Sequence, residues 1–87
     1  MTFNNGTELI GAFIPVSPFL AKLGVVADRL DDDVAILRLP WSPDLATMGD
    51  LVHGGAIAAL ADAAVMAGAW VGAAIPETLR GVTVSLA

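Results

Sequence analysis

The sequence predicts an α+β domain that is organised around one long helix, and three observations support this fold class. Residues 52–70 are apolar and rich in alanine, the strongest helix former, with Asp62 as their one charge and no proline. Residues 24–39 contain two apolar runs that are separated by three aspartates, which is typical of a β-hairpin. Residues 82–86 alternate between apolar and hydroxyl side chains, as a strand does.

The first element is a short helix that we predict over residues 8–14. Pro15 ends this helix, and Ser17-Pro18 marks a turn. The next apolar residues are interpreted as anchors for the core rather than as an element of their own: Phe19, Leu20 and Leu23.

A hairpin follows, with strands predicted over residues 24–30 and 34–39. The three carboxylates at residues 31–33 repel one another, which favours a turn in solvent. They do not match a calcium loop, which needs a glycine and a distant glutamate at fixed spacing. In the return strand, one face is expected to hold Ala35, Leu37 and Leu39.

Residues 40–52 are predicted to be a loop, and the long helix to run from Gly54 or Gly55 to about Gly72. A polar connector over residues 76–81 leads to the last strand. A helix that is apolar nearly all round must be buried nearly all round. Since three strands cannot wrap it, further strands, a partner chain or lipid must cover it. We therefore expect residues 1–87 to be a single, truncated domain that is not a stable monomer.

Composition narrows the classes of function. The net charge is −5, and the four cations are scattered along the chain, so nucleic-acid binding is not expected. The chain has no cysteine and one histidine, so thiolate and histidine-rich metal sites are not expected either. The N-terminal residues lack the pattern of a signal peptide, and we expect a cytoplasmic protein.

The start of the long helix is the candidate functional site. Its first turn carries unpaired backbone N–H groups and the positive end of the helix dipole. Gly54 and Gly55 would let an oxygen atom of another molecule approach closely, and Asp62 lies about two turns further on. Two plainer interpretations stay open: a tight loop-to-helix turn at the glycines, and an ordinary loop role for His53. Asp62 is harder to explain structurally, because an unpaired carboxylate on an apolar helix is costly.

The run His-Gly-Gly-Ala-Ile-Ala-Ala-Leu-Ala-Asp, residues 53–62, resembles the helix-start motif of hotdog-fold thioesterases of the PaaI-like or 4-hydroxybenzoyl-CoA thioesterase type. Residues 17–24, 39–45 and 81–86 resemble supporting segments of the same family. The resemblance covers the whole chain but only the first part of the family's domain. It implies a hotdog fold, in which a curved antiparallel sheet wraps a long central helix.

The resemblance also implies catalytic roles. The Gly54 N–H would polarise the thioester carbonyl, His53 would position the turn or the substrate, and Asp62 would attack the thioester or activate water. No cofactor and no metal are implied.

Three further residues are expected to contact substrate: Gly55, Thr47 and Thr83. Thr83 falls where many relatives have a serine or threonine that helps to place water. Thr47 stands six residues before His53, where relatives often have asparagine. Because a threonine hydroxyl cannot reproduce an amide, this contact is expected to differ in rate or specificity.

These residues predict a thioester hydrolase that acts on acyl-CoA or an acyl-carrier thioester. Gly54 and Asp62 are eight residues apart, or ~12 Å along one helix, so we expect a homo-oligomer, a dimer or a tetramer, in which two chains share the site.

Two other functions compete with hydrolysis. The first is a hotdog protein that binds acyl thioesters, or a dehydratase, without hydrolysis. The second is a membrane or interaction helix, because residues 54–75 could span a bilayer and Gly68-x-x-x-Gly72 is a small-residue spacing. Asp62 at mid-span, with an insertion penalty of ~2.5–3.5 kcal/mol, argues against a membrane segment.

Overall fold

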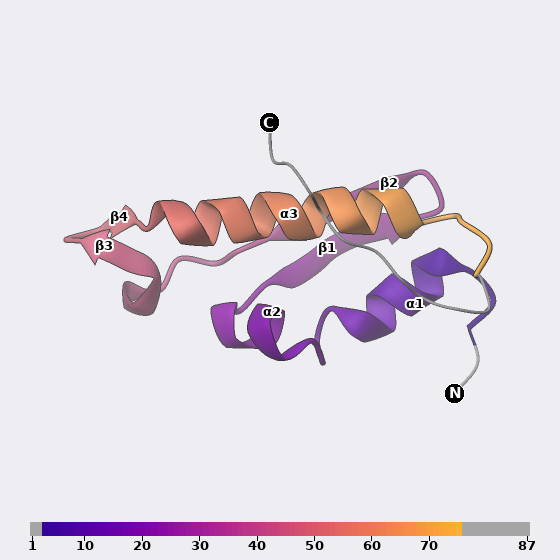
Figure 1. Ribbon diagram of the computed structural model, residues 1–87, viewed down its shortest axis with the longest axis horizontal. Helices are drawn as coiled ribbons and strands as arrows, with labels where there is room; N and C mark the ends of the chain where they lie inside the picture. The colour runs from indigo at the N-terminus through magenta and orange to yellow at the C-terminus, as the bar shows by residue number, and fades with distance from the viewer. Residues whose placement is uncertain (1–2, 76–87) are drawn as a thin grey trace.

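The computed structural model describes residues 3–75, in which four helical segments alternate with two antiparallel hairpins (Figure 1). Its elements, in chain order, are α1 (Gly6–Phe13), α2 (Pro18–Leu23), β1 (Val26–Asp31), β2 (Val34–Arg38), the short 3₁₀ helix η1 (Pro43–Leu45), β3 (Ala46–Met48), β4 (Leu51–Val52) and α3 (Gly54–Trp70). The predicted α+β class is confirmed. The predicted connector and strand over residues 76–86, with Thr83, lie outside the described residues.

The long helix is confirmed as α3, a helix of 17 residues. It begins at Gly54, as predicted, and ends at Trp70, slightly before the predicted end. The chain turns away at Gly72, whose φ of +74° is accessible to glycine at little steric cost. A Cβ atom at this position would also clash with the carbonyl oxygen of Asp32, so the turn requires glycine.

The N-terminal segment is more helical than the sequence predicted. α1 begins at Gly6, two residues before the predicted start, because the Asn5 side chain accepts the Glu8 N–H and caps the helix. Residues expected only to anchor the core form α2, which begins at Pro18 and ends at Leu23. Gly24, with φ +88°, follows directly. Proline at the first helical position and glycine just past the last are typical helix boundaries, so this missed helix was signalled in the sequence.

The first hairpin agrees with its prediction. β1 and β2 pair antiparallel, with Leu30 opposite Ala35 and a bulge near Asp28. The predicted shared face of the return strand is confirmed, and it is the face that packs against the core, with three side chains: Ala35, Leu37 and Leu39. Residues 40–52, predicted to be a plain loop, instead contain η1 and the hairpin β3–β4. Strands of three and two residues are too short to produce a recognisable alternation.

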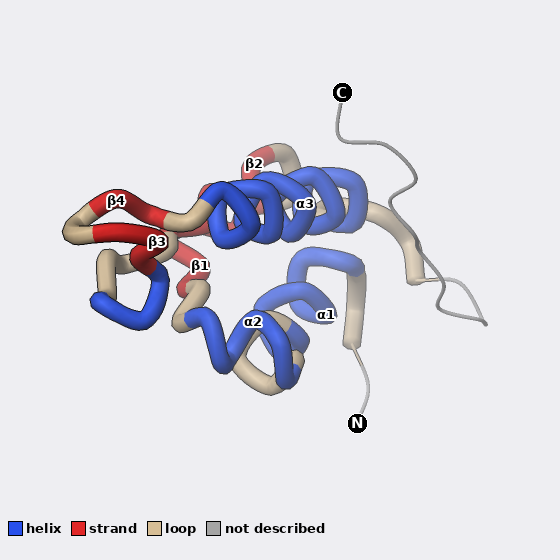
Figure 2. The backbone as a smooth tube through the Cα atoms, turned by 60° about the vertical axis from the view of Figure 1, so that its left-hand side comes forward, coloured by secondary structure: helices blue, strands red, loops and turns tan. Residues whose placement is uncertain are grey.

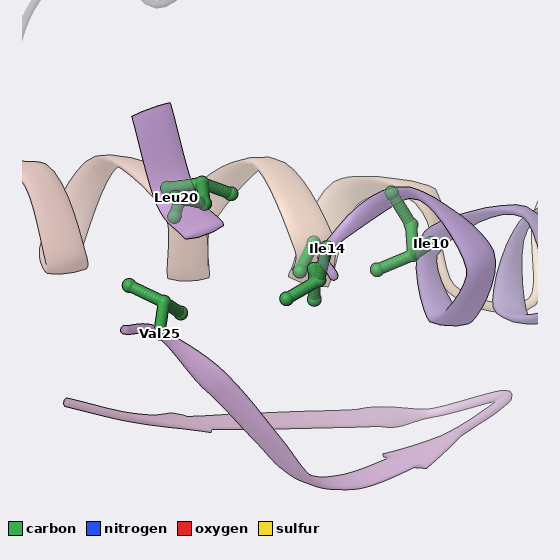
Figure 3. Packing of buried hydrophobic residues seen from close by; sticks show 6 residues of the cluster. Ile10, Ile14, Leu20 and Val25 are labelled. Carbon is green, nitrogen blue, oxygen red and sulfur yellow. The ribbon is translucent and has the colours of Figure 1, made fainter. Parts of the chain in front are cut away.

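The buried core lies between α1, α2, the start of β1 and one side of α3 (Figure 3). The larger side chains come from the N-terminal part: Ile10, Ile14, Leu20 and Val25. α3 contributes Ala63 and Ala67, whose small side chains let the other elements approach the helix closely. α1 and α2 lie along one side of α3, and β2 contacts it as well (Figure 2).

Among the residues that the structure describes, one side of α3 is exposed, and the expectation that further strands, a partner chain or lipid cover this helix stays a prediction. Ile57 and Val65 are 58% and 61% exposed. They lie on an exposed stripe that also contains Gly54, Ala58, Ala61, Gly68 and Ala69. The β1–β2 hairpin and the helices α1 and α2 cover only the opposite side of α3. The stripe leaves apolar surface available for another element or another chain.

The aspartates at residues 31–33 are exposed, as predicted, but the turn is shorter than predicted, because Asp31 is the last residue of β1. Asp32 has a further role, because its Oδ1 accepts hydrogen bonds from the Thr7 hydroxyl at 2.7 Å and the Asn5 amide at 3.2 Å. The Thr7 oxygen in turn accepts the Gly72 N–H at 2.8 Å. One threonine therefore joins the start of α1, the β1–β2 turn and the chain that leaves α3.

Replacing Thr7 with valine is expected to lower the midpoint of thermal unfolding. Valine has the shape of threonine but loses both hydrogen bonds, each of which contributes about 1 kcal/mol. Thr7→Ser keeps the hydroxyl and should stay much closer to wild type. Differential scanning calorimetry of the three proteins checks this, and equal midpoints for the valine and serine variants would refute the structural role of this hydroxyl.

Candidate functional site

The start of α3 is capped by a histidine. His53 precedes the helix in an extended conformation, with φ −62° and ψ 135°, and its Nδ1 accepts the Gly55 N–H at 2.8 Å. Its carbonyl oxygen accepts the N–H groups of the next turn, from Ala56 at 3.0 Å and Ile57 at 3.3 Å. Its own N–H donates to the Leu45 carbonyl at 2.7 Å. His53 is thus held from both sides by its backbone while its ring closes the helix end.

The Gly54 N–H is the open donor of this turn. As the first residue of α3 it has no acceptor within its own helix, and the described residues offer it no other. A Cβ atom built at Gly54 would meet nothing within 4 Å, so the space around this residue is free. The turn can therefore present one N–H, at the positive end of the helix dipole, to an oxygen of a bound molecule.

Gly55, unlike Gly54, does not offer a free N–H group. Its N–H is occupied by His53, so only one of the two glycines offers a free donor. A Cβ atom at Gly55 would lie 3.0 Å from the His53 Nδ1 and 3.3 Å from Cε1. Glycine at this position makes room for the imidazole. The sequence could not reveal this pairing, because histidine is not among the preferred N-cap residues.

Asp62 lies in the middle of α3 and is half-buried. Its Oδ1 is buried, with no hydrogen-bond partner among the described residues. A buried carboxylate oxygen without a hydrogen-bond donor is energetically unfavourable unless another molecule, such as a substrate, water or a partner chain, supplies one. Asp62 therefore has the property expected of a functional residue. The structure does not bring it to Gly54, since eight residues of helix separate them by ~12 Å.

The two other predicted contact residues are less well defined. Thr47 is exposed on β3, which pairs with β4 directly before His53, so it belongs to the hairpin that leads into the site. Thr83 lies outside the described residues.

Exposed apolar side chains gather on the elements at this end of α3, where Figure 1 places β3 and β4. Met48 is 73% exposed, and three further large side chains are also exposed there: Trp41, Leu51 and Ile57. The Trp41 indole donates to the Asp50 carbonyl at 3.3 Å, which holds the ring against the hairpin. These residues could not be recognised from the sequence as neighbours of the helix start, because their position depends on the unpredicted β3–β4 hairpin.

Two ion pairs lie away from the helix start. Arg29 contacts Asp31 at 2.6 Å, and Arg38 contacts Asp28 at 3.0 Å, both on the surface of the first hairpin. Over residues 3–75, no three histidine, aspartate or glutamate side chains are grouped as metal ligands would be.

Comparison with known proteins gave no match to any family model, curated protein or solved structure. Within residues 3–75, no helix combines the length and the apolar character that crossing a membrane requires.

Proposed function

We propose that this protein is a cytoplasmic acyl-thioester hydrolase of the hotdog type, which converts an acyl-CoA or acyl-carrier thioester into the free acid and the thiol. The observation that carries the proposal is the orphaned Asp62 oxygen on a helix whose first N–H, at Gly54, is open. The reaction class, thioester hydrolysis, is inferred from the resemblance of residues 53–62 to the helix-start motif of hotdog-fold thioesterases.

The chemistry needs a donor for the carbonyl oxygen and a base or nucleophile for the carbonyl carbon. As water or a carboxylate adds to the thioester, negative charge builds on the oxygen, and the Gly54 N–H with the helix dipole stabilises it. Asp62 either removes a proton from the attacking water or attacks the carbonyl itself. The carbon–sulfur bond then breaks, and the thiolate takes up a proton as it leaves. Where Asp62 is the nucleophile, this leaves a mixed anhydride, which water hydrolyses to the free acid and the restored carboxylate.

One chain cannot place both groups on one thioester, because reacting atoms must lie within roughly 3–3.5 Å of one another. We propose that a second copy of the chain supplies the second group. The exposed stripe on α3, made largely of glycine and alanine, would permit close contact between two antiparallel helices. A two-fold axis would then place each Gly54 near the Asp62 of the other chain. The assembly would be a dimer, or a tetramer of two such dimers.

The hotdog architecture is part of the same proposal. A long helix with an apolar exposed stripe, preceded by an antiparallel hairpin on its opposite side, is compatible with a central helix that further strands complete. A non-hydrolytic acyl-thioester binding protein or a dehydratase would share this architecture. These two functions and hydrolysis are therefore distinguished by the reaction that the protein catalyses.

The direct test is to incubate the protein with a panel of acyl-CoA esters and to measure free thiol. Thiol release above the uncatalysed rate, with the matching free acid, is the expected result. Binding of the esters without thiol release, measured by calorimetry on the same preparation, would favour the non-hydrolytic alternative. Loss of water from a 3-hydroxyacyl ester would favour a dehydratase.

A further inference from the structure

The cap of α3 uses the one histidine in the chain. N-cap positions are usually occupied by serine, threonine, aspartate or asparagine, whose oxygen atoms accept an N–H at any physiological pH. Histidine is the side chain whose charge ordinarily changes between about pH 5 and 8. A histidine cap can thus respond to pH where the common caps cannot.

The hydrogen bond at His53 fixes the state of its ring. A backbone N–H can only donate, so the Nδ1 atom 2.8 Å from the Gly55 nitrogen must carry a lone pair. The ring is then neutral, with its proton on Nε2. Gly55 lets the imidazole approach the backbone this closely, because a Cβ atom at this residue would lie 3.0 Å from Nδ1.

We infer that His53 is a pH-sensitive cap that sets the number of free N–H donors at the start of α3. When Nδ1 gains a proton it becomes a donor and can no longer accept the Gly55 N–H. The new positive charge also opposes the positive end of the helix dipole. The protonated ring therefore leaves Gly55, and the turn passes from one open donor, at Gly54, to two. Any effect on turnover rests on the proposed function, but the structural switch does not.

Other titratable groups on the elements around His53 are carboxylates. Within the described residues they are Asp44 on η1, Asp50 between β3 and β4, and Asp62 on α3. The signals of the imidazole nitrogens themselves separate a change at His53 from a change at these carboxylates.

The test follows the imidazole and the Gly55 amide by NMR in the ¹⁵N-labelled full chain, in its native assembly, over about pH 5 to 8. Magic-angle spinning serves if the assembly is large. At the upper end, the Nδ1 signal is expected to be that of an unprotonated nitrogen and the Nε2 signal that of a protonated one. On acidification, the Gly55 amide signal should move with the same midpoint as the ring.

His53→Asn is the matched control, because its side-chain oxygen can still cap the helix but does not titrate. Its Gly55 amide signal should stay constant over this range. The inference is overturned if the neutral wild-type ring carries its proton on Nδ1, or if the Gly55 signal does not follow the ring. The wild-type measurement alone decides the matter if the variant fails to fold. Neither readout needs turnover, so a failure here is distinct from a failure of the hydrolase proposal.

Discussion

The Asp62→Asn variant is expected to lose about 10²- to 10⁴-fold in kcat while it keeps its fold. Asparagine has nearly the shape of aspartate, so it fits the same half-buried place on α3. It lacks the negative charge that makes Asp62 a base or a nucleophile. Because the Asp62 Oδ1 has no partner among the described residues, the substitution removes no hydrogen bond seen there. The loss should therefore appear in turnover and not in stability.

Asp44→Asn is a matched control for this experiment. It makes the same change of charge at an exposed position on η1, and its turnover should stay near that of wild type. Thermal unfolding and thiol release are measured on one preparation of each protein. If Asp62→Asn shifts the unfolding midpoint and spares turnover, Asp62 is a structural residue and the proposed mechanism is wrong.

The Gly54→Pro variant is expected to lower kcat by about 100-fold or more, the effect of removing one oxyanion donor. Proline lacks the N–H but suits the first position of a helix, where no hydrogen bond is lost. The residue before a proline must be extended, and His53 already is, with φ −62° and ψ 135°. The space around Gly54 is open, so the ring meets no neighbour near its Cβ. The substitution thus removes the donor and little else.

Gly54→Ala distinguishes the role of the Gly54 N–H from the need for glycine at this position. Alanine keeps the N–H, and its Cβ would enter free space. This variant should retain far more activity than Gly54→Pro, as measured by steady-state thiol release. Equal losses in the two variants would mean that the position demands glycine for close approach, and that its N–H does not stabilise the transition state.

The sequence predicted the elements whose residues repeat a clear pattern. The alanine-rich run predicted α3 and its start at Gly54, and the alternation over residues 34–39 predicted which side chains share a face of the return strand. The sequence did not predict β3 and β4, because strands of three and two residues are defined by their pairing rather than by periodicity. Nor did it predict the exposed stripe on α3, because a helix that is apolar all round does not indicate which side its neighbours cover.

The candidate site was predicted in outline and corrected in detail. The helix start and the isolated charge of Asp62 can be read from the sequence, since glycines and a carboxylate stand out in an apolar run. The ring of His53 on the Gly55 N–H could not be predicted, because it depends on a side-chain rotamer. Because of this contact, the Gly55 N–H is capped, whereas the Gly54 N–H is open.

The central claim is that the Gly54 N–H of one chain and the Asp62 of another act on the same thioester. The most direct measurement mixes Asp62→Asn chains with Gly54→Pro chains, after exchange of subunits, and records thiol release. Each variant alone should be nearly inactive. A mixed dimer would contain one site with an intact glycine turn and an intact aspartate, so the mixture should regain activity. If mass spectrometry detects mixed dimers and no activity returns, the shared site is refuted.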